Sequence, residues 1–420
     1  MNKQKLLKIF IINQTFHWFI VGIIVPIIAL LQLEKGLNLF QIGISMAIYS
    51  GTIVLLELPT GGLSDTIGRK KVYLISLMIQ FAAAFILLIA QKFQGIILGF
   101  LLLGMARAFS SGSMDAWFVD KFYLINRKGN LQEALAKVGI FIPLGLAGGS
   151  LLGGFLPMTL GKIINQIPKL GTYSSNLIAI LLFVIIQYLL TSKIIVEEIP
   201  TQRKSDIISG FKLLPEVLSA SIQYGIKNNI IFLLLLSTFA WGVGFSGLET
   251  FWQPQVKNIL GSDSQTWVFG ALTAGYFFAR SIGNVFITPL CKLFKNNYLL
   301  VLFFLRFFMG VLLFILALQN KIAGFTIFYL TLFLYNGMSN APHATIFNYQ
   351  IPAEKRSTLL SFESLFLQIG GLLGALIMGY ISNSFSINIA WFIGSAVLVL
   401  SCFTYLYLFI SKKSIVEQKV

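Results

Sequence analysis

The chain has 420 residues, of which 56% are hydrophobic and only 11% are charged, and its mean hydropathy is +0.83. Soluble domains are typically about a quarter charged, so this composition excludes an ordinary water-soluble enzyme. It also excludes a disordered chain, which needs low hydrophobicity and high charge. A polytopic membrane protein remains, with its apolar residues in spans of about 20 residues.

The net charge is +16, from 31 Lys and Arg residues against 15 Asp and Glu residues. In a soluble protein such an excess would suggest nucleic acid as the partner. Here the basic residues lie in short segments between apolar runs, which is typical of membrane topology. We therefore expect a lipid bilayer and no nucleic acid as the partner.

Polar breaks divide the chain into twelve apolar stretches, which predict an all-α membrane protein with twelve transmembrane helices. The predicted spans are 9–32, 41–60, 72–91, 95–118, 135–157, 174–192, 228–250, 265–289, 298–319, 323–345, 359–382 and 386–411. The apolar run after the basic N-terminal segment is too long for a signal peptide, and we expect a retained first helix.

The distribution of basic residues predicts the orientation. With the N-terminus inside, 22 of the 31 Lys and Arg residues fall on inner segments and 6 on outer loops. Because cytoplasmic loops carry the excess of positive charge, we expect both termini to be cytoplasmic.

The chain also shows a weak internal repeat. The longest inner segment, 193–227, predicts a cytoplasmic linker between two six-helix bundles at 1–192 and 228–420. When the sequence is shifted by 225 residues, seven glycines of the first half coincide with glycines of the second. This pattern favours two pseudo-symmetric halves, as in secondary transporters built from parallel repeats.

The segment after the second span reads GGLSDTIGRKK from Gly61 to Lys71. It resembles the signature loop of the major facilitator superfamily, G-x-L-x-D-x-x-G-R-K. The matching residues are Gly61, Leu63, Asp65, Gly68, Arg69 and Lys70. With twelve predicted spans in two halves, the resemblance covers essentially the whole chain and implies the major facilitator fold.

The resemblance also implies roles for residues of this loop. In the family, the loop's Asp and Arg belong to a charge network that gates the inner side. Asp65 would then lie near the N-terminus of the eleventh span, where the helix dipole favours an anion. Arg69 would pair with Asp120 at the inner end of the fourth span.

A glycine motif in the fifth span is similar to the antiporter motif of drug and metabolite exporters in the same family, G-x-x-x-G-P-x-x-G-G. Gly145, Gly149, Gly153 and Gly154 match, but Ser150 replaces the proline. Close helix packing through small residues is the alternative explanation, and both stay open.

Ionisable residues inside predicted spans are candidates for proton coupling, because a charge in the membrane is costly. Arg107 lies near the middle of the fourth span, with Asp115 eight residues later, and Glu57 ends the second span. A fixed salt bridge or a packing role is the alternative for each. Glu249 and Glu363 are expected at the membrane interfaces.

The candidate residues of a substrate cavity are His17, Trp18, Trp241 and Arg280. An aromatic cavity suits amphipathic, ring-containing substrates. His17 could titrate near neutral pH or be a packing residue. Arg306 is expected to be structural.

Several classes of site are absent from the sequence. There is no Walker loop for ATP and no catalytic constellation, so we expect no enzyme and no cofactor. His17 and His343 lie far apart without acidic clusters, so we expect no metal site. Two cysteines, Cys291 and Cys402, make no disulfide framework.

The prediction from sequence is a monomeric, proton-coupled secondary transporter resembling drug:proton antiporters, which exports amphipathic small molecules across the inner membrane. The alternatives are a facilitator that imports or exports a metabolite, a siderophore or an organic anion, and a polytopic membrane enzyme.

Overall fold

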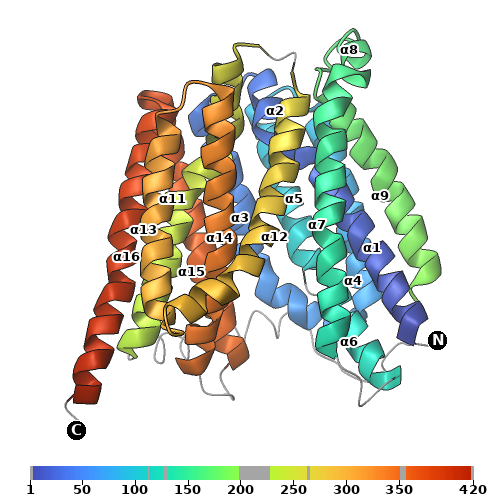
Figure 1. Ribbon diagram of the computed structural model, residues 1–420. Coiled ribbons are helices and arrows are strands. Elements are labelled where there is room, and N and C mark those ends of the chain that lie inside the picture. The colour runs from blue at the N-terminus through green and yellow to red at the C-terminus, as the bar shows by residue number, and fades with distance from the viewer. Residues whose placement is uncertain are drawn as a thin grey trace. The chain divides into compact units, whose positions relative to one another are not determined.

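The computed structural model describes residues 3–111, 113–125, 131–197, 228–262, 265–350 and 356–417 (Figure 1). Within these ranges the regular structure is helical throughout. The first half contains α1 (Lys3–Ile24), η1 (Val25–Ile27), α2 (Ile28–Glu34), α3 (Leu39–Ile67), α4 (Arg69–Ile89), α5 (Phe93–Ser110), α6 (Ser113–Ile125), α7 (Leu131–Phe155), η2 (Leu156–Met158), α8 (Leu160–Ile164) and α9 (Ser174–Ile194). The second half contains α11 (Asn229–Leu260), α12 (Trp267–Leu293), α13 (Tyr298–Ala317), α14 (Ile322–Gln350), α15 (Arg356–Ser384) and α16 (Ile387–Glu417).

Each of the twelve predicted spans corresponds to a long helix or to two consecutive helices of the described chain. Eleven of them are long and apolar enough to cross a membrane. The remaining one is α12, which carries Arg280 and Asn284 among its apolar residues. Its lower hydropathy is consistent with a helix that turns a polar side toward other helices rather than toward lipid.

The described residues form two compact units. The first unit holds those of Met1–Leu37, Ile48–Leu214 and Asp263–Ala274. The second unit holds those of Asn38–Ala47, Pro215–Ser262 and Gly275–Val420. Each unit thus contains most of one predicted half and a short stretch of a helix from the other. Most of the predicted linker, 198–227, lies outside the described residues.

The signature segment is more helical than expected. We expected a loop from Gly61, but α3 continues to Ile67, and only Gly68 separates it from α4. Gly68 has a φ of +101°, a backbone conformation that other residues rarely adopt. The glycine therefore allows a turn of one residue between two long helices.

The predicted fourth span is not one helix. The helix α5 ends at Ser110, and α6 begins at Ser113, so Arg107 and Asp115 lie on different helices. The side chain of Ser110 donates a hydrogen bond to the carbonyl oxygen of Arg107, and that of Ser113 to the carbonyl oxygen of Ser110. Such local bonds compete with helical ones, and they explain why the apolar pattern alone missed the break.

Glycines bring paired helices into backbone contact in both halves. A Cβ atom on Gly145, Gly149 or Gly153 of α7 would collide with backbone carbonyls of α1. A Cβ atom on Gly370 or Gly374 of α15 would collide with backbone atoms of α11 in the same way. Gly145 and Gly149 coincide with Gly370 and Gly374 under the 225-residue shift, so the repeat in the sequence corresponds to a repeated helix contact.

Two further close contacts lie at the ends of these same helices. Gly154 at the end of α7 faces Gly270 of α12, and the hydroxyl of Thr266 donates a 2.6 Å hydrogen bond to the carbonyl oxygen of Gly154. On α15, Gly379 faces Gly43 of α3. Each contact lies within one compact unit.

We predict that Gly149→Ala destabilises the protein by about 1–3 kcal/mol, because the added methyl group would collide with the carbonyl of Phe19. Gly148→Ala is the matched control, since its Cβ would meet only the Phe19 ring at an ordinary 3.7 Å. The intrinsic helix propensity changes equally in both variants. Thermal unfolding of the purified proteins measures the difference, and equal melting temperatures would contradict the close contact.

Candidate functional site

The signature segment is tied to two other parts of the first unit. Arg69 forms an ion pair with Asp120 of α6 at 2.5 Å, as the resemblance implies. The Asp120 side chain is 63% exposed and that of Arg69 is 19% exposed, so the pair lies at the surface of the unit. Lys70 reaches in another direction and donates a 2.8 Å hydrogen bond to the carbonyl oxygen of Ser192 on α9.

Glu197 makes a contact with this segment that we did not foresee. Its two carboxylate oxygens accept hydrogen bonds from the backbone N–H groups of Arg69 and Lys70, at 2.8 and 3.0 Å. These are free N–H groups in the first turn of α4, where the helix dipole favours a negative charge. Glu197 thus caps α4 and joins the residues after α9 to the signature segment.

Three further predicted residues belong to this region. Gly61 lies on α3. The side chains of Glu57 and Asp65 lie outside the part that the structure describes. Their expected roles in coupling and gating therefore stay predictions.

A chain of buried polar groups links α1, α4 and α9 within the first unit. The amide nitrogen of Gln187 donates hydrogen bonds to the carbonyl oxygen of Asn13 and to the hydroxyl of Tyr73. The Tyr73 hydroxyl then lies 3.0 Å from Nδ1 of His17. The Tyr73 hydroxyl thus links Gln187 of α9 to His17 of α1.

Three predicted residues meet beside this chain. The Arg107 guanidinium lies over the ring of Trp18, 5.0 Å from its centroid, and the Trp18 ring packs edge-on against His17. A cation over an aromatic face is attracted electrostatically, so Trp18 compensates part of the charge of Arg107. Asp115 on α6 lies within electrostatic reach of Arg107, without forming an ion pair with it among the described residues.

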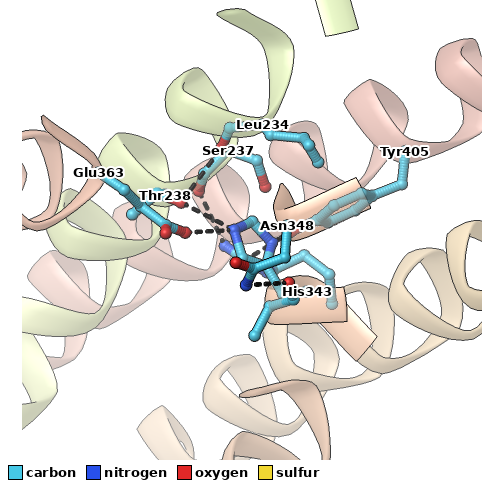
Figure 2. A network of polar contacts seen from close by, with 9 residues as sticks. Leu234, Ser237, Thr238, His343, Asn348, Glu363 and Tyr405 are labelled. Carbon is cyan, nitrogen blue, oxygen red and sulfur yellow. Dashed lines mark hydrogen bonds and ion pairs between the residues drawn. The ribbon is translucent and has the colours of Figure 1, made fainter. Parts of the chain in front are cut away.

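A second polar cluster lies in the second unit and centres on His343 of α14 (Figure 2). Its Nε2 atom lies 2.7 Å from a carboxylate oxygen of Glu363 on α15, and 3.3 Å from the hydroxyl of Thr238 on α11. Thr238 donates its own proton to the carbonyl oxygen of Leu234, so Nε2 is the donor in both contacts. Figure 2 shows the imidazole between these partners and Tyr405 of α16.

The other nitrogen of His343 is also engaged. Nδ1 lies 3.1 Å from the hydroxyl of Tyr405, whose oxygen accepts a hydrogen bond from Arg306 of α13. Arg306 also donates to the carbonyl oxygen of Ser237 and lies over the Tyr405 ring. Five helices thus contribute to one hydrogen-bonded cluster, in which His343 can carry one or two protons.

The cluster lines a cavity of about 240 Å³ within the second unit. The predicted cavity residues Trp241 and Arg280 lie on its wall together with His343 and Glu363. The other lining residues are Thr238, Leu302, Arg306, Asn336, Ser339, Asn340, Ala344, Leu367 and Tyr405. Across the described residues, no group of three or more His, Cys, Asp or Glu side chains could hold a metal ion.

The sequence did not indicate this cluster. We assigned Glu363 to an interface, Arg306 to a structural role, and no role to His343. These residues come from separate helices and share no spacing, so only the packing of the helices brings them together. The sequence offered one indication of a functional site, namely that an ionisable side chain within an apolar span is costly. This indication applied equally to His343, Glu363 and Arg306, so it did not show that they belong together.

Comparison with known proteins agrees with this architecture. The family model of the Major Facilitator Superfamily matches residues 10–349 and, in a second alignment, residues 234–419. The chain belongs to the major facilitator superfamily. This transporter is therefore a multi-pass membrane protein with the major facilitator fold, as the signature segment predicted.

Two relatives and one solved structure illustrate the likeness. The inner membrane transport protein YajR of Escherichia coli (strain K12) is 30% identical over 215 residues, 49% of this chain and 42% of YajR, so the chain aligns with under half of that relative. The quinolone resistance protein NorA of Staphylococcus aureus (strain COL) is 21% identical over 379 residues, 90% of each chain. The crystal structure of the nucleoside transporter NupG superposes with a TM-score of 0.77 at 13% identity, over 96% of this chain and 99% of NupG.

We predict that Glu197→Ala costs more stability than Asp120→Ala, although both remove a carboxylate from the signature segment of this transporter. Glu197 accepts two backbone hydrogen bonds at a helix N-terminus, which are worth about 1–2 kcal/mol. Asp120 takes part in an exposed ion pair, worth about 0–1 kcal/mol. Thermal unfolding of both variants at low and high salt measures this, and the reverse order would show that the cap carries little energy.

Proposed function

We propose that this transporter is proton-coupled and exports amphipathic small molecules across the inner membrane as a monomer with both termini in the cytoplasm. The observation that carries the proposal is the hydrogen-bonded pair of His343 and Glu363 on the wall of the cavity. A titratable pair that lines a substrate-sized space can link the binding of a proton to that of a substrate.

The chemistry of the pair suits proton transfer. Histidine titrates near neutral pH when it is unperturbed, and a carboxylate 2.7 Å away can share its proton. Arg306 and Tyr405 hold the far side of the imidazole, so the ring keeps its orientation in either state. Ionisable residues within membrane spans commonly mark proton pathways.

The direction of transport rests on the relatives. NorA, which aligns along 90% of both chains, is named a quinolone resistance protein. The glycine motif of α7 resembles the antiporter motif of exporters. YajR is named an inner membrane transport protein, which supports the same location for this chain.

For the transport cycle, we propose that the halves 1–192 and 228–420 rock about a central cavity. Asp65 and the Arg69–Asp120 pair would then close the inner side in one state and release in the other. The cap formed by Glu197 supports this proposal, because it fixes α4 next to the segment that has to move.

A second candidate is the proton-coupled uptake of an organic anion. It is favoured by Arg280, which lines the cavity and has no hydrogen bond or ion pair among the described residues. In uptake the proton and the substrate move in the same direction, whereas in export they move in opposite directions. Measuring the direction of substrate flux in vesicles of known orientation separates the two candidates.

We predict that Glu363→Gln abolishes transport driven by a pH gradient but preserves substrate exchange at equal pH. The amide keeps the shape of the side chain and cannot take up the proton. The measurement is substrate flux together with proton flux in proteoliposomes. Glu34→Gln is a control with an acid of the first unit, whose carboxylate accepts hydrogen bonds from the backbone N–H groups of Thr172 and Tyr173. Undiminished proton flux in Glu363→Gln would remove this pair from the mechanism.

We predict that the wild type protects a bacterial host lacking its own efflux pumps against some amphipathic drugs, and that Asp65→Asn does not. The panel contains tetracyclines, quinolones, macrolides, phenicols and lipophilic cations, with expression matched in the membrane. Protection by both proteins would contradict the gating role of Asp65. Protection by neither, with transport intact in vesicles, would favour the uptake of a metabolite.

A further inference from the structure

We propose that the cavity of the second unit binds the anionic head group of the substrate, a carboxylate, through Arg280 and Asn336. This inference rests on the second candidate function proposed above, the proton-coupled uptake of an organic anion, and it names the residues of the cavity that would bind the anion.

The charges on the cavity wall favour an anion. The wall contains two arginines, Arg280 and Arg306, and one acid, Glu363, whose carboxylate is hydrogen-bonded to His343. Arg306 is bound by neutral groups only, a backbone carbonyl and a tyrosine hydroxyl, which leave its positive charge in place. With one proton shared by the His343–Glu363 pair, the wall has a net positive charge.

Arg280 is the cation that remains free to bind a ligand. Among the described residues its guanidinium has no hydrogen bond and no ion pair within 4 Å. Glu249 of α11 lies within electrostatic reach but does not line the cavity. A guanidinium in a membrane span needs a partner, and a carboxylate is the group that its planar donors match best.

Asn336 supplies an independent observation. Its side chain is only 3% exposed, lies on the cavity wall, and has no hydrogen-bond partner among the described residues. Because it lines the cavity, its amide has two N–H donors and a carbonyl acceptor available to a ligand. An amide N–H can donate to the same carboxylate as Arg280.

Backbone contacts bring the helices that carry these two residues close together. Gly337 follows Asn336 on α14, and a Cβ atom there would collide with the backbone of Arg280 on α12. One turn further along α12, Gly283 packs in the same way on Leu334 of α14. Two glycines thus bring the helices into contact at the level where Arg280 and Asn336 line the cavity.

The size of the cavity restricts what enters it. A volume of about 240 Å³ is below the range of about 300–1,000 Å³ typical of whole-ligand pockets. It accommodates a head group and part of a ring, and Trp241 provides an aromatic wall that stacks on Phe245 at 4.9 Å. The apolar remainder of an amphipathic substrate would extend out of this cavity.

The same arrangement determines how proton and substrate affect each other. The groups that face His343 are Glu363, Tyr405 and Arg306, with Arg280 on the same wall. A proton added to the pair raises the positive charge of the wall, so it strengthens the binding of an anion and weakens that of a cation. Joint binding of proton and anion is the requirement for co-transport, so this arrangement belongs to the uptake candidate, the second function proposed above.

The test compares three probes with the same phenyl ring and chain: 4-phenylbutanoate, its primary amide and 4-phenylbutylamine. Binding to the full-length protein in lipid nanodiscs is measured by calorimetry at pH 6.0 and 7.5. We expect the carboxylate to bind at least about ten-fold more tightly than the amide, and more tightly at the lower pH. Equal binding of the three probes, tighter binding of the amine, or no binding of the carboxylate would overturn the proposal.

Variants assign the effect to the residues. Arg280→Gln should remove the preference for the carboxylate, Arg280→Lys should keep most of it, and Asn336→Leu should weaken it several-fold. An unchanged preference in Arg280→Gln would overturn the assignment. If Arg280→Gln does not fold, the Asn336→Leu variant and the three probes on the wild type still show whether the cavity prefers a carboxylate.

The outcome is separable from that of the proposed function. Proton flux in proteoliposomes tests coupling through Glu363 and requires no charge on the substrate. Intact proton coupling without preference for the carboxylate would reject only the substrate class. A clear preference for the carboxylate without proton coupling would reject the proposed function and keep the anion site.

Discussion

The cost of an ionisable side chain in an apolar environment determines much of this structure. Such a group remains charged only where dipoles, rings or opposite charges compensate it. The transporter meets this requirement differently at each site. Arg107 lies over Trp18, whereas Arg306 is bound by a backbone carbonyl and by Tyr405. Arg280 has only the more distant charge of Glu249 and no hydrogen bond or ion pair among the described residues, and this makes it informative about function.

Close helix packing is the second requirement, and glycine satisfies it. Backbones of α1 and α7, and of α11 and α15, touch at positions that a single methyl group would block. Without a hydrophobic force between helices in lipid, such contacts and a few hydrogen bonds hold the bundle together. The glycine pattern that resembles an antiporter motif therefore has a structural role in α7, whatever its relation to the direction of transport.

The sequence predicted the helices of the fold well, because hydropathy is a property of consecutive residues. The Arg69–Asp120 pair also followed from a local motif. The cluster around His343 did not, because it combines single residues of five helices and only packing relates them. The break after Ser110 was missed for another reason: serine side chains altered the helix without changing its hydropathy. Glu197 gave no signal, since a glutamate at the end of a basic segment looks like any surface residue.

The buried histidines of the two units have different partners. In the first unit, Gln187, Tyr73 and His17 form a hydrogen-bonded chain without a carboxylate. In the second unit, His343 has a carboxylate partner, and Arg280 and Asn336 on the same cavity wall are unpaired. A hydrogen-bonded chain without a carboxylate stabilises one arrangement of helices, whereas a charged wall changes its affinity for a charged ligand with each proton that it binds. The polar groups of the second unit are therefore the ones on which the proposed link between binding and protonation rests.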